Sequence, residues 1–160
     1  MTVEDKPEPW EQLYRYWRSK CHGETPPARA DLDPLIEIPQ LTPHLMLVDV
    51  LPDGGFRYRL AGSDLGSRLG VELTGSHIGR STENEAKWLD MMSAVARGQK
   101  PLIVTSDVPP PGAGKRLALV LPLVDRSGRT ECIFCGIFFG NDFWPGMRIG
   151  DLTAQGVTMT

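Results

Sequence analysis

Apolar and polar residues alternate along the stretch FRYRLAG at 56–62, which carries an apolar side chain at every second position. This period of two predicts a strand with one buried face. An apolar segment at 44–51 precedes the stretch, and the turn residues PDGG at 52–55 join the two. The pattern therefore predicts a β-hairpin.

Spacings of three and four residues mark the helices. Residues 10–20 carry a stripe of four large apolar side chains, Trp10, Leu13, Tyr14 and Trp17. Residues 83–98 follow a capping box and end in glycine, which predicts a longer helix. A short helix is predicted at 34–37 with Asp33 as its cap, and a helical turn is predicted after the glycine at 62.

The second half of the chain is rich in strands. Apolar runs predict three of them, at 102–108, 115–124 and 131–140. Short loops between consecutive strands are typical of an antiparallel meander. The elements therefore predict an α+β domain over residues 10–140, with a loose arm at 1–9 and a tail at 141–160.

Composition is that of an ordinary soluble protein. The chain has 160 residues, 41% hydrophobic and 23% charged, with a formal net charge of -3. This length indicates one domain with a substantial core. The acidic balance argues against a nucleic-acid partner. The acidic N-terminus has no apolar core like that of a signal peptide, and no apolar run is long enough to span a bilayer, so a cytoplasmic location without membrane attachment is expected.

The three cysteines do not indicate a disulfide framework or a metal site. Cys132 and Cys135 form a C-x-x-C pattern, but they lie in a predicted strand. Residues three apart in a strand point to opposite faces, so the two thiols are expected to be separate core residues. Helical metal-binding spacing is also missing, and PPPGAGKR at 109–116 lacks the glycine and hydroxyl positions of a phosphate-binding loop. No metal and no catalytic residue is predicted.

Five short sequences carry a likeness to a known family. They are W-x6-W at 10–17, RADLDP at 29–34, FRYRLAG at 56–62, LTG at 73–75 and LPLVDRSG at 121–128. Together they resemble a PAS domain, most closely the single-PAS-domain family frequent in alphaproteobacteria. The likeness extends over about residues 10 to 140. It implies a five-stranded antiparallel sheet in the order 2-1-5-4-3, with helices on one face.

The resemblance also implies sensing or protein interaction rather than catalysis, and it carries over no functional residue. Heme-binding PAS domains place a ligating histidine on the long helix, and residues 83–98 contain none. Light-sensing flavin PAS domains place a cysteine in an N-C-R-F-like helical motif, whereas Cys21, Cys132 and Cys135 lie elsewhere. Neither heme nor flavin is therefore expected, and no cofactor is predicted.

A small apolar or aromatic ligand is expected between the helices and one face of the sheet. The candidate lining residues are Phe56, Tyr58, Leu60, Trp88, Met91, Met92, Leu119, Leu121, Ile133 and Cys135. The alternative is that these side chains simply fill the core, because methionine and aromatic stripes commonly serve packing.

The opposite faces of the fourth and fifth strands are also apolar, so something must cover them. The N-terminal helix is the candidate, alone or together with the same helix of a second subunit. This predicts a homodimer with the interface residues Trp10, Leu13, Tyr14, Trp17, Val120, Pro122, Phe134 and Phe138. Three arginines, Arg57, Arg59 and Arg116, are expected on the same side, paired with Asp31 and Asp33.

The sequence therefore favours a stand-alone PAS-like regulatory module that binds an unidentified partner protein and is gated by a small ligand. Two alternatives stay open. One is a small cup-fold isomerase or dehydratase that uses His44, Asp49 or Tyr58 as its acid–base group. The other is a dimerisation scaffold with a filled core.

Overall fold

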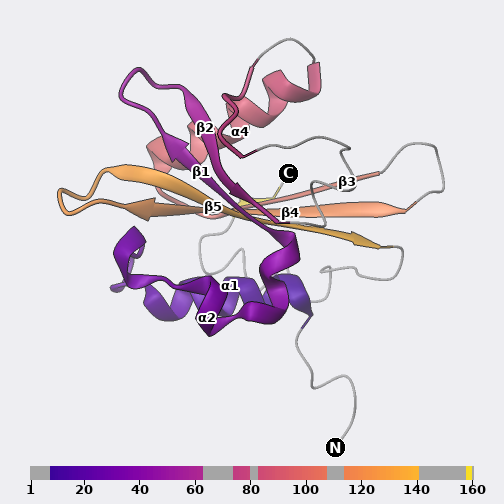
Figure 1. The fold of residues 1–160 in the computed structure, drawn as a ribbon, viewed down its shortest axis with the longest axis horizontal. Coiled ribbons are helices and arrows are strands. Elements are labelled where there is room, and N and C mark those ends of the chain that lie inside the picture. The colour runs from indigo at the N-terminus through magenta and orange to yellow at the C-terminus, as the bar shows by residue number, and fades with distance from the viewer. Residues whose placement is uncertain (1–7, 63–73, 80–82, 108–113, 141–157, 160) are drawn as a thin grey trace, which may run out of the picture.

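The computed structural model describes residues 8–62, 74–79, 83–107, 114–140 and 158–159, and Figure 1 shows how their elements are arranged. The predicted helical turn after Gly62 lies outside the described residues. So do the first residue of the capping box, Thr82, and most of the tail.

Six strands form one sheet in the order β2-β1-β5-β4-β3-β6. They are β1 (Leu45–Val50), β2 (Phe56–Ala61), β3 (Leu102–Asp107), β4 (Lys115–Val124), β5 (Thr130–Gly140) and β6 (Thr158–Met159). Neighbouring strands among the first five are antiparallel, which confirms the predicted five-stranded sheet and its order. β6 extends the sheet by pairing in parallel with β3. It has only two residues, too few to show any periodicity in the sequence.

Helices lie on both faces of this sheet. α4 (Glu83–Gly98) lies on one face, and α1 (Pro9–Lys20) and α2 (Pro34–Glu37) lie on the other (Figure 1). Two 3₁₀ turns, Arg29–Asp31 and Pro39–His44, lead from α1 to β1. None of the helices that the structure describes has the length and hydrophobicity needed to cross a bilayer.

The α1 stripe is the cover of the outer sheet face, as predicted. Its four side chains are at most 4% exposed, and they pack in one core with Leu117, Leu119, Leu121, Leu123, Phe134 and Phe138. The indole Nε1 of Trp17 donates a hydrogen bond to the carbonyl oxygen of Pro122 at 3.0 Å. One chain therefore buries this stripe by itself, and the need to cover it no longer argues for a second subunit.

The predicted orientation of β4 was wrong. Leu119 and Leu121 were expected to face α4, but both lie in the core on the α1 side. Val120, expected on the outer face, lies in the core on the α4 side. The reason is that β4 is buried at every position from Leu117 to Val124, so no polar residue marks either face.

The register between β4 and β5 shows how the faces are assigned. Leu121 lies opposite Phe134, and Pro122 lies opposite Ile133. Directly opposite residues share a face of the sheet, so Pro122 belongs with Ile133 on the α4 side rather than with the outer face. The predicted alternation of β5 itself is confirmed, since Cys132 and Cys135 lie in the two different cores.

A β-bulge in β2 redirects Leu60. Leu47 pairs with Leu60, whereas the next residue, Val48, pairs with Tyr58, so Arg59 is the extra residue. Leu60 consequently packs against the α1-side core. The prediction had placed it beside Tyr58 on the opposite face of the sheet. A period-two pattern contains no signal for such an insertion.

Arg57 and Arg59 both pair with Asp49 of β1, so the predicted pairing with Asp31 and Asp33 was wrong. The Arg57 Nη2 to Asp49 Oδ2 distance is 3.2 Å, and the Arg59 Nε to Asp49 Oδ1 distance is 2.7 Å. The hydrogen bond that Arg59 donates to the Asp49 carboxylate raises the pKa of Arg59. A nearly buried carboxylate is thereby paired with two guanidinium groups across the β1–β2 ladder.

Candidate functional site

Seven of the ten predicted ligand-binding residues come together between α4 and the sheet. We call this set the cup: Phe56, Tyr58, Trp88, Met91, Met92, Ile133 and Cys135. The other three predicted residues, Leu60, Leu119 and Leu121, lie on the α1 side of the sheet and do not belong to it. The cup therefore combines β2, β5 and one stripe of α4.

Some members of this set, which we call its floor, are fully buried, and others, which we call its rim, are not. Met92, Ile133 and Cys135 have no exposed surface. Tyr58, Trp88 and Met91 are only partly buried, although they pack against the same core. Trp88, Met91 and Met92 fall on one face of α4 because they are three and four residues apart. Large apolar side chains thus reach from the core toward the surface at this place.

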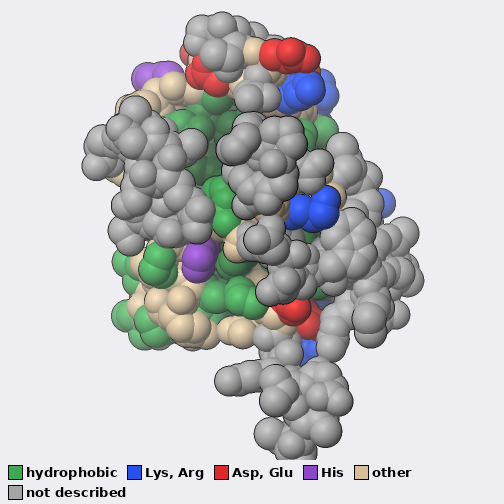
Figure 2. Space-filling model, turned by 90° about the vertical axis from the view of Figure 1, so that its right-hand side faces the viewer, with side chains coloured by type: hydrophobic (Ala, Val, Ile, Leu, Met, Phe, Trp, Pro, Cys, Tyr) green, Lys and Arg blue, Asp and Glu red, His purple; other side chains and the backbone are tan. Residues whose placement is uncertain are grey.

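Figure 2 shows the side of the molecule that lies at the right of Figure 1. Hydrophobic side chains are visible in both halves of this view, and the upper half is the one in which Figure 1 places α4 and β2. The polar side chains around them include acidic and basic groups. The members of the cup are hydrophobic side chains, and the Glu85 carboxylate lies close enough to act on the Tyr58 hydroxyl from outside this set. Such a set of side chains is suited to a predominantly apolar ligand.

Tyr58 is the polar group of the cup. Its backbone is held by two hydrogen bonds to one neighbouring segment, because its N–H donates to the Ser76 carbonyl at 2.9 Å and its own carbonyl accepts from the Gly75 N–H at 2.6 Å. Burial raises the pKa of its hydroxyl, and a side-chain hydrogen bond with Trp88 opposes that rise. The phenol is therefore neutral at physiological pH, and it is a fixed hydrogen-bonding group in apolar surroundings.

Sequence reasoning missed several members of this cluster. Met46, Val48, Val95 and Val120 are buried in it, and Ile78 packs against it. The alternation of β1 would have identified Met46 and Val48 once β1 was paired with β5. Ile78 offered no such signal, since it lies outside any regular element and is placed by the hydrogen bond from its N–H to the Phe56 carbonyl.

The cysteines of β5 are inert packing groups. Burial raises the pKa of Cys132 to about 12, and burial raises that of Cys135 well above its ordinary value. A neutral thiol is a poor nucleophile and a poor metal ligand. Among the residues that the structure describes, no group of three His, Cys, Asp or Glu side chains is placed to hold a metal ion.

The three residues suggested for acid–base chemistry do not form one site. Tyr58 lies on the α4 side of the sheet. Asp49 is engaged by Arg57 and Arg59, and the ring of His44 packs against Phe138 of the α1-side core with the centroids 5.1 Å apart. General acid–base catalysis needs such groups within hydrogen-bond reach of one substrate. The arrangement therefore gives no support to an isomerase or dehydratase.

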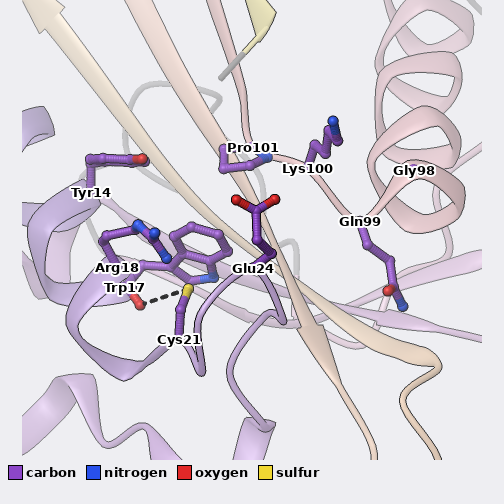
Figure 3. A pocket seen from close by; sticks show the side chains of 9 residues that line it. All are labelled: Tyr14, Trp17, Arg18, Cys21, Glu24, Gly98, Gln99, Lys100 and Pro101. Carbon is purple, nitrogen blue, oxygen red and sulfur yellow. Dashed lines mark hydrogen bonds between the residues drawn. The ribbon is translucent and has the colours of Figure 1, made fainter. Parts of the chain in front are cut away.

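A separate hollow of about 190 Å³ lies at the end of α1, away from the cup (Figure 3). We call it the α1 cleft. It is lined by Tyr14, Trp17, Arg18, Cys21, Glu24, Gly98, Gln99, Lys100 and Pro101. Its two walls are the C-terminal end of α1 with the turn that follows, and the connection from α4 to β3. Sequence reasoning did not find it, because its walls are some 75 residues apart in the chain.

Comparison with known proteins adds a family and a fold. The family model described as a PAS domain matches residues 5–138. No curated protein sequence matches the chain. Among solved structures, the PAS domain of BvgS from Bordetella pertussis is similar with a TM-score of 0.52 and 18% identity, over 71% of this chain and 90% of that one. A light-oxygen-voltage domain studied with a flavin analogue is similar with a TM-score of 0.51 and 12% identity, over 79% and 98%.

Proposed function

This chain belongs to the PAS domain family, and on that basis we propose that it is a sensory or regulatory module that binds a small apolar or aromatic molecule in the cup. Occupancy of the cup would then be communicated to a partner protein through contacts on the surface. No catalytic step is part of this proposal.

One observation carries the proposal. The cup pairs a fully buried floor with a rim of large side chains, Tyr58, Trp88 and Met91, that its own core does not fully bury. A ligand that covers them would remove apolar area from water, at about 25 cal/mol per Å². The neutral Tyr58 hydroxyl offers such a ligand one orienting hydrogen bond.

The proposal does not extend to flavin photochemistry, even though a light-oxygen-voltage domain shares the fold. That comparison rests on 12% identity and concerns the fold alone. Cys132 and Cys135 are buried in β5, and Cys21 follows α1, so the helical cysteine expected of flavin photochemistry is not supplied by any of the three. Heme is not proposed either, because α4 carries no histidine.

Native mass spectrometry of the purified full chain tests the cup. We expect a bound small molecule that is released under denaturing conditions. Met91→Trp should fill the rim and remove the adduct. Leu35→Trp makes a comparable change at an exposed position of α2 and should leave the adduct in place. Loss of the adduct in both variants, or in neither, would contradict binding in the cup. If the purified chain never carries or takes up a ligand, the result would favour the alternative of a dimerisation scaffold with a filled core.

We further propose that the partner contacts, including those of a homodimer, use surfaces other than the α1 stripe. The stripe packs on the sheet of its own chain and is almost completely buried. Two apolar side chains of α2, Leu35 and Ile36, are 54% and 75% exposed and are better placed for a weak contact. Cross-linking of the Leu35→Asp variant, compared with cross-linking of the wild-type chain, checks this. We expect fewer cross-linked products for the variant, and an unchanged pattern of products would argue against a contact through α2.

A further inference from the structure

The α1 cleft has a rigid apolar floor. Tyr14 and Trp17 are at most 4% exposed, and Pro101 is buried on the opposite wall. The hydrogen bond from the Trp17 indole to the Pro122 carbonyl fixes the ring on the sheet. An aromatic floor held by packing and by this hydrogen bond is suited to the aliphatic part of a ligand, because ordering it on binding costs little conformational entropy.

The rim of the cleft is charged. Arg18, Glu24 and Lys100 are all exposed and all border the hollow (Figure 3). In the described part of the chain, none of the three forms an ion pair with another side chain. The Arg18 side chain is oriented by a hydrogen bond from its Nη1 to the Gly23 carbonyl at 2.7 Å. Its guanidinium group has further N–H donors that this contact does not use.

These charges define the kind of ligand. A ligand carboxylate can pair with a cation of the rim, Arg18 or Lys100, and a ligand ammonium group can pair with the carboxylate of Glu24. A molecule with only one of the two charges would gain only one of these two pairings. The volume of about 190 Å³ limits the ligand to a small one. We propose that the α1 cleft is a binding site for a small zwitterion, such as an aliphatic α-amino acid.

The cleft also touches the element that lines the cup. Its second wall, Gly98 to Pro101, continues directly from the C-terminal end of α4. The Gln99 N–H donates to the Val95 carbonyl at 2.8 Å, and the Gln99 side chain donates to the Gly128 carbonyl at 2.7 Å. A ligand held against this wall would restrain the end of α4. The site therefore lies on the other side of the sheet from the cup but shares a helix with it.

Titration of the full chain followed by backbone amide NMR tests the site, with three probes of the same skeleton. L-valine has both charges, isobutylamine lacks the carboxylate, and isovalerate lacks the amine. We expect valine to shift the amides of Trp17, Arg18 and Lys100 with saturation. Each single-charge analogue should bind roughly twofold to fivefold more weakly, as exposed ion pairs contribute modestly. Absence of saturation with valine would overturn the proposal.

Matched variants locate the binding. Lys100→Gln should weaken valine binding by a similar factor, whereas Lys87→Gln, an equal charge change on the exposed side of α4, should not. Glu24→Gln should reduce the difference in affinity between valine and isovalerate, because it removes the carboxylate that pairs with the ammonium group of valine. Equal affinity in all three variants would overturn the assignment. Amide shifts confined to Tyr58 and Trp88 would also overturn the assignment, because they would place valine in the cup. The proposal that the cup binds a ligand would survive that result.

Discussion

At Gly136 the Leu13 side chain of α1 packs directly against the backbone of β5. A Cβ at this position would overlap the Leu13 side chain and would lie 2.8 Å from Cε2 of Phe138. We predict that Gly136→Ala lowers the free energy of unfolding by about 1–3 kcal/mol, because the packed side chains of Leu13 and Phe138 must shift to make room for the added methyl group. Urea denaturation measures this change.

Gly98→Ala is the matched control, because nothing lies within 4 Å of a Cβ there. Its effect should be below about 1 kcal/mol and in the stabilising direction. Equal destabilisation by the two substitutions would mean that α1 does not pack against Gly136.

Gln99 is the non-glycine residue with positive φ, 55°, among the described residues. It ends α4 in the left-handed conformation, and its side chain compensates with hydrogen bonds to Gly128 and Thr130. We predict that Gln99→Ala is less stable than Gln99→Gly by about 1 kcal/mol, since both lose the side-chain bonds and only glycine is free of the backbone cost. Thermal unfolding of the two variants measures the difference, and the reverse order would refute the account.

Single residues also show where prediction from sequence fails. Arg59 occupies a bulge, so every residue of β2 that follows it changes face, and Leu60 leaves the cup. The residue type at position 59 does not predict the bulge. Phe56 and Tyr58 were placed correctly because they precede the bulge.

At the scale of elements, α2 is held to α1 by one carboxylate. Glu37 accepts hydrogen bonds from the Tyr16 hydroxyl at 2.6 Å, from the Lys20 ammonium at 2.9 Å and from the Asp33 N–H at 3.1 Å. The hydrogen bond from Tyr16, followed by that from Lys20, lowers the pKa of Glu37 from its ordinary 4.5 to about 2. These contacts are solvent-exposed, so their contribution to stability is modest.

A carboxylate whose folded pKa is depressed stabilises the fold above its unfolded pKa and stops doing so as the pH falls toward the folded value. We therefore predict that wild type is more stable than Glu37→Gln above about pH 4.5, and that the difference closes between there and pH 2. Unfolding curves across this range measure it, with Glu24→Gln as the control for removing an acidic side chain. Titration of Glu37 near pH 4.5 in an NMR experiment would contradict the prediction.

The strands and α4 could be predicted to within one or two residues, because turn chemistry and capping residues mark their ends. The orientation of β4 could not. A strand that is apolar on both faces offers two equally good alternations, and only its pairing with β5 decides between them. The α1 cleft could not be predicted either, since its two walls meet only after the sheet has formed.

At the scale of the whole molecule, the question is whether the α1 stripe belongs to the core of one chain or to an interface between two subunits. The structure buries Trp17 in a core within one chain. We predict that Trp17→Ala costs about 3–5 kcal/mol of folding free energy without changing the mass in solution. Its unfolding midpoint, like that of wild type, should not depend on protein concentration. A midpoint that rises with concentration would instead indicate that folding and dimerisation are linked.

The position of the two β5 cysteines has a consequence for kinetics. Cys132 and Cys135 are three residues apart in one strand, yet each is buried in a different core, one under α1 and one under α4. A thiol reagent reaches a buried cysteine only when the layer above it opens. The labelling rate of Cys132 therefore reports how often α1 lifts from the sheet, and that of Cys135 reports how often α4 does. The native chain thus contains one cysteine whose labelling rate measures the opening of each of its two helical layers.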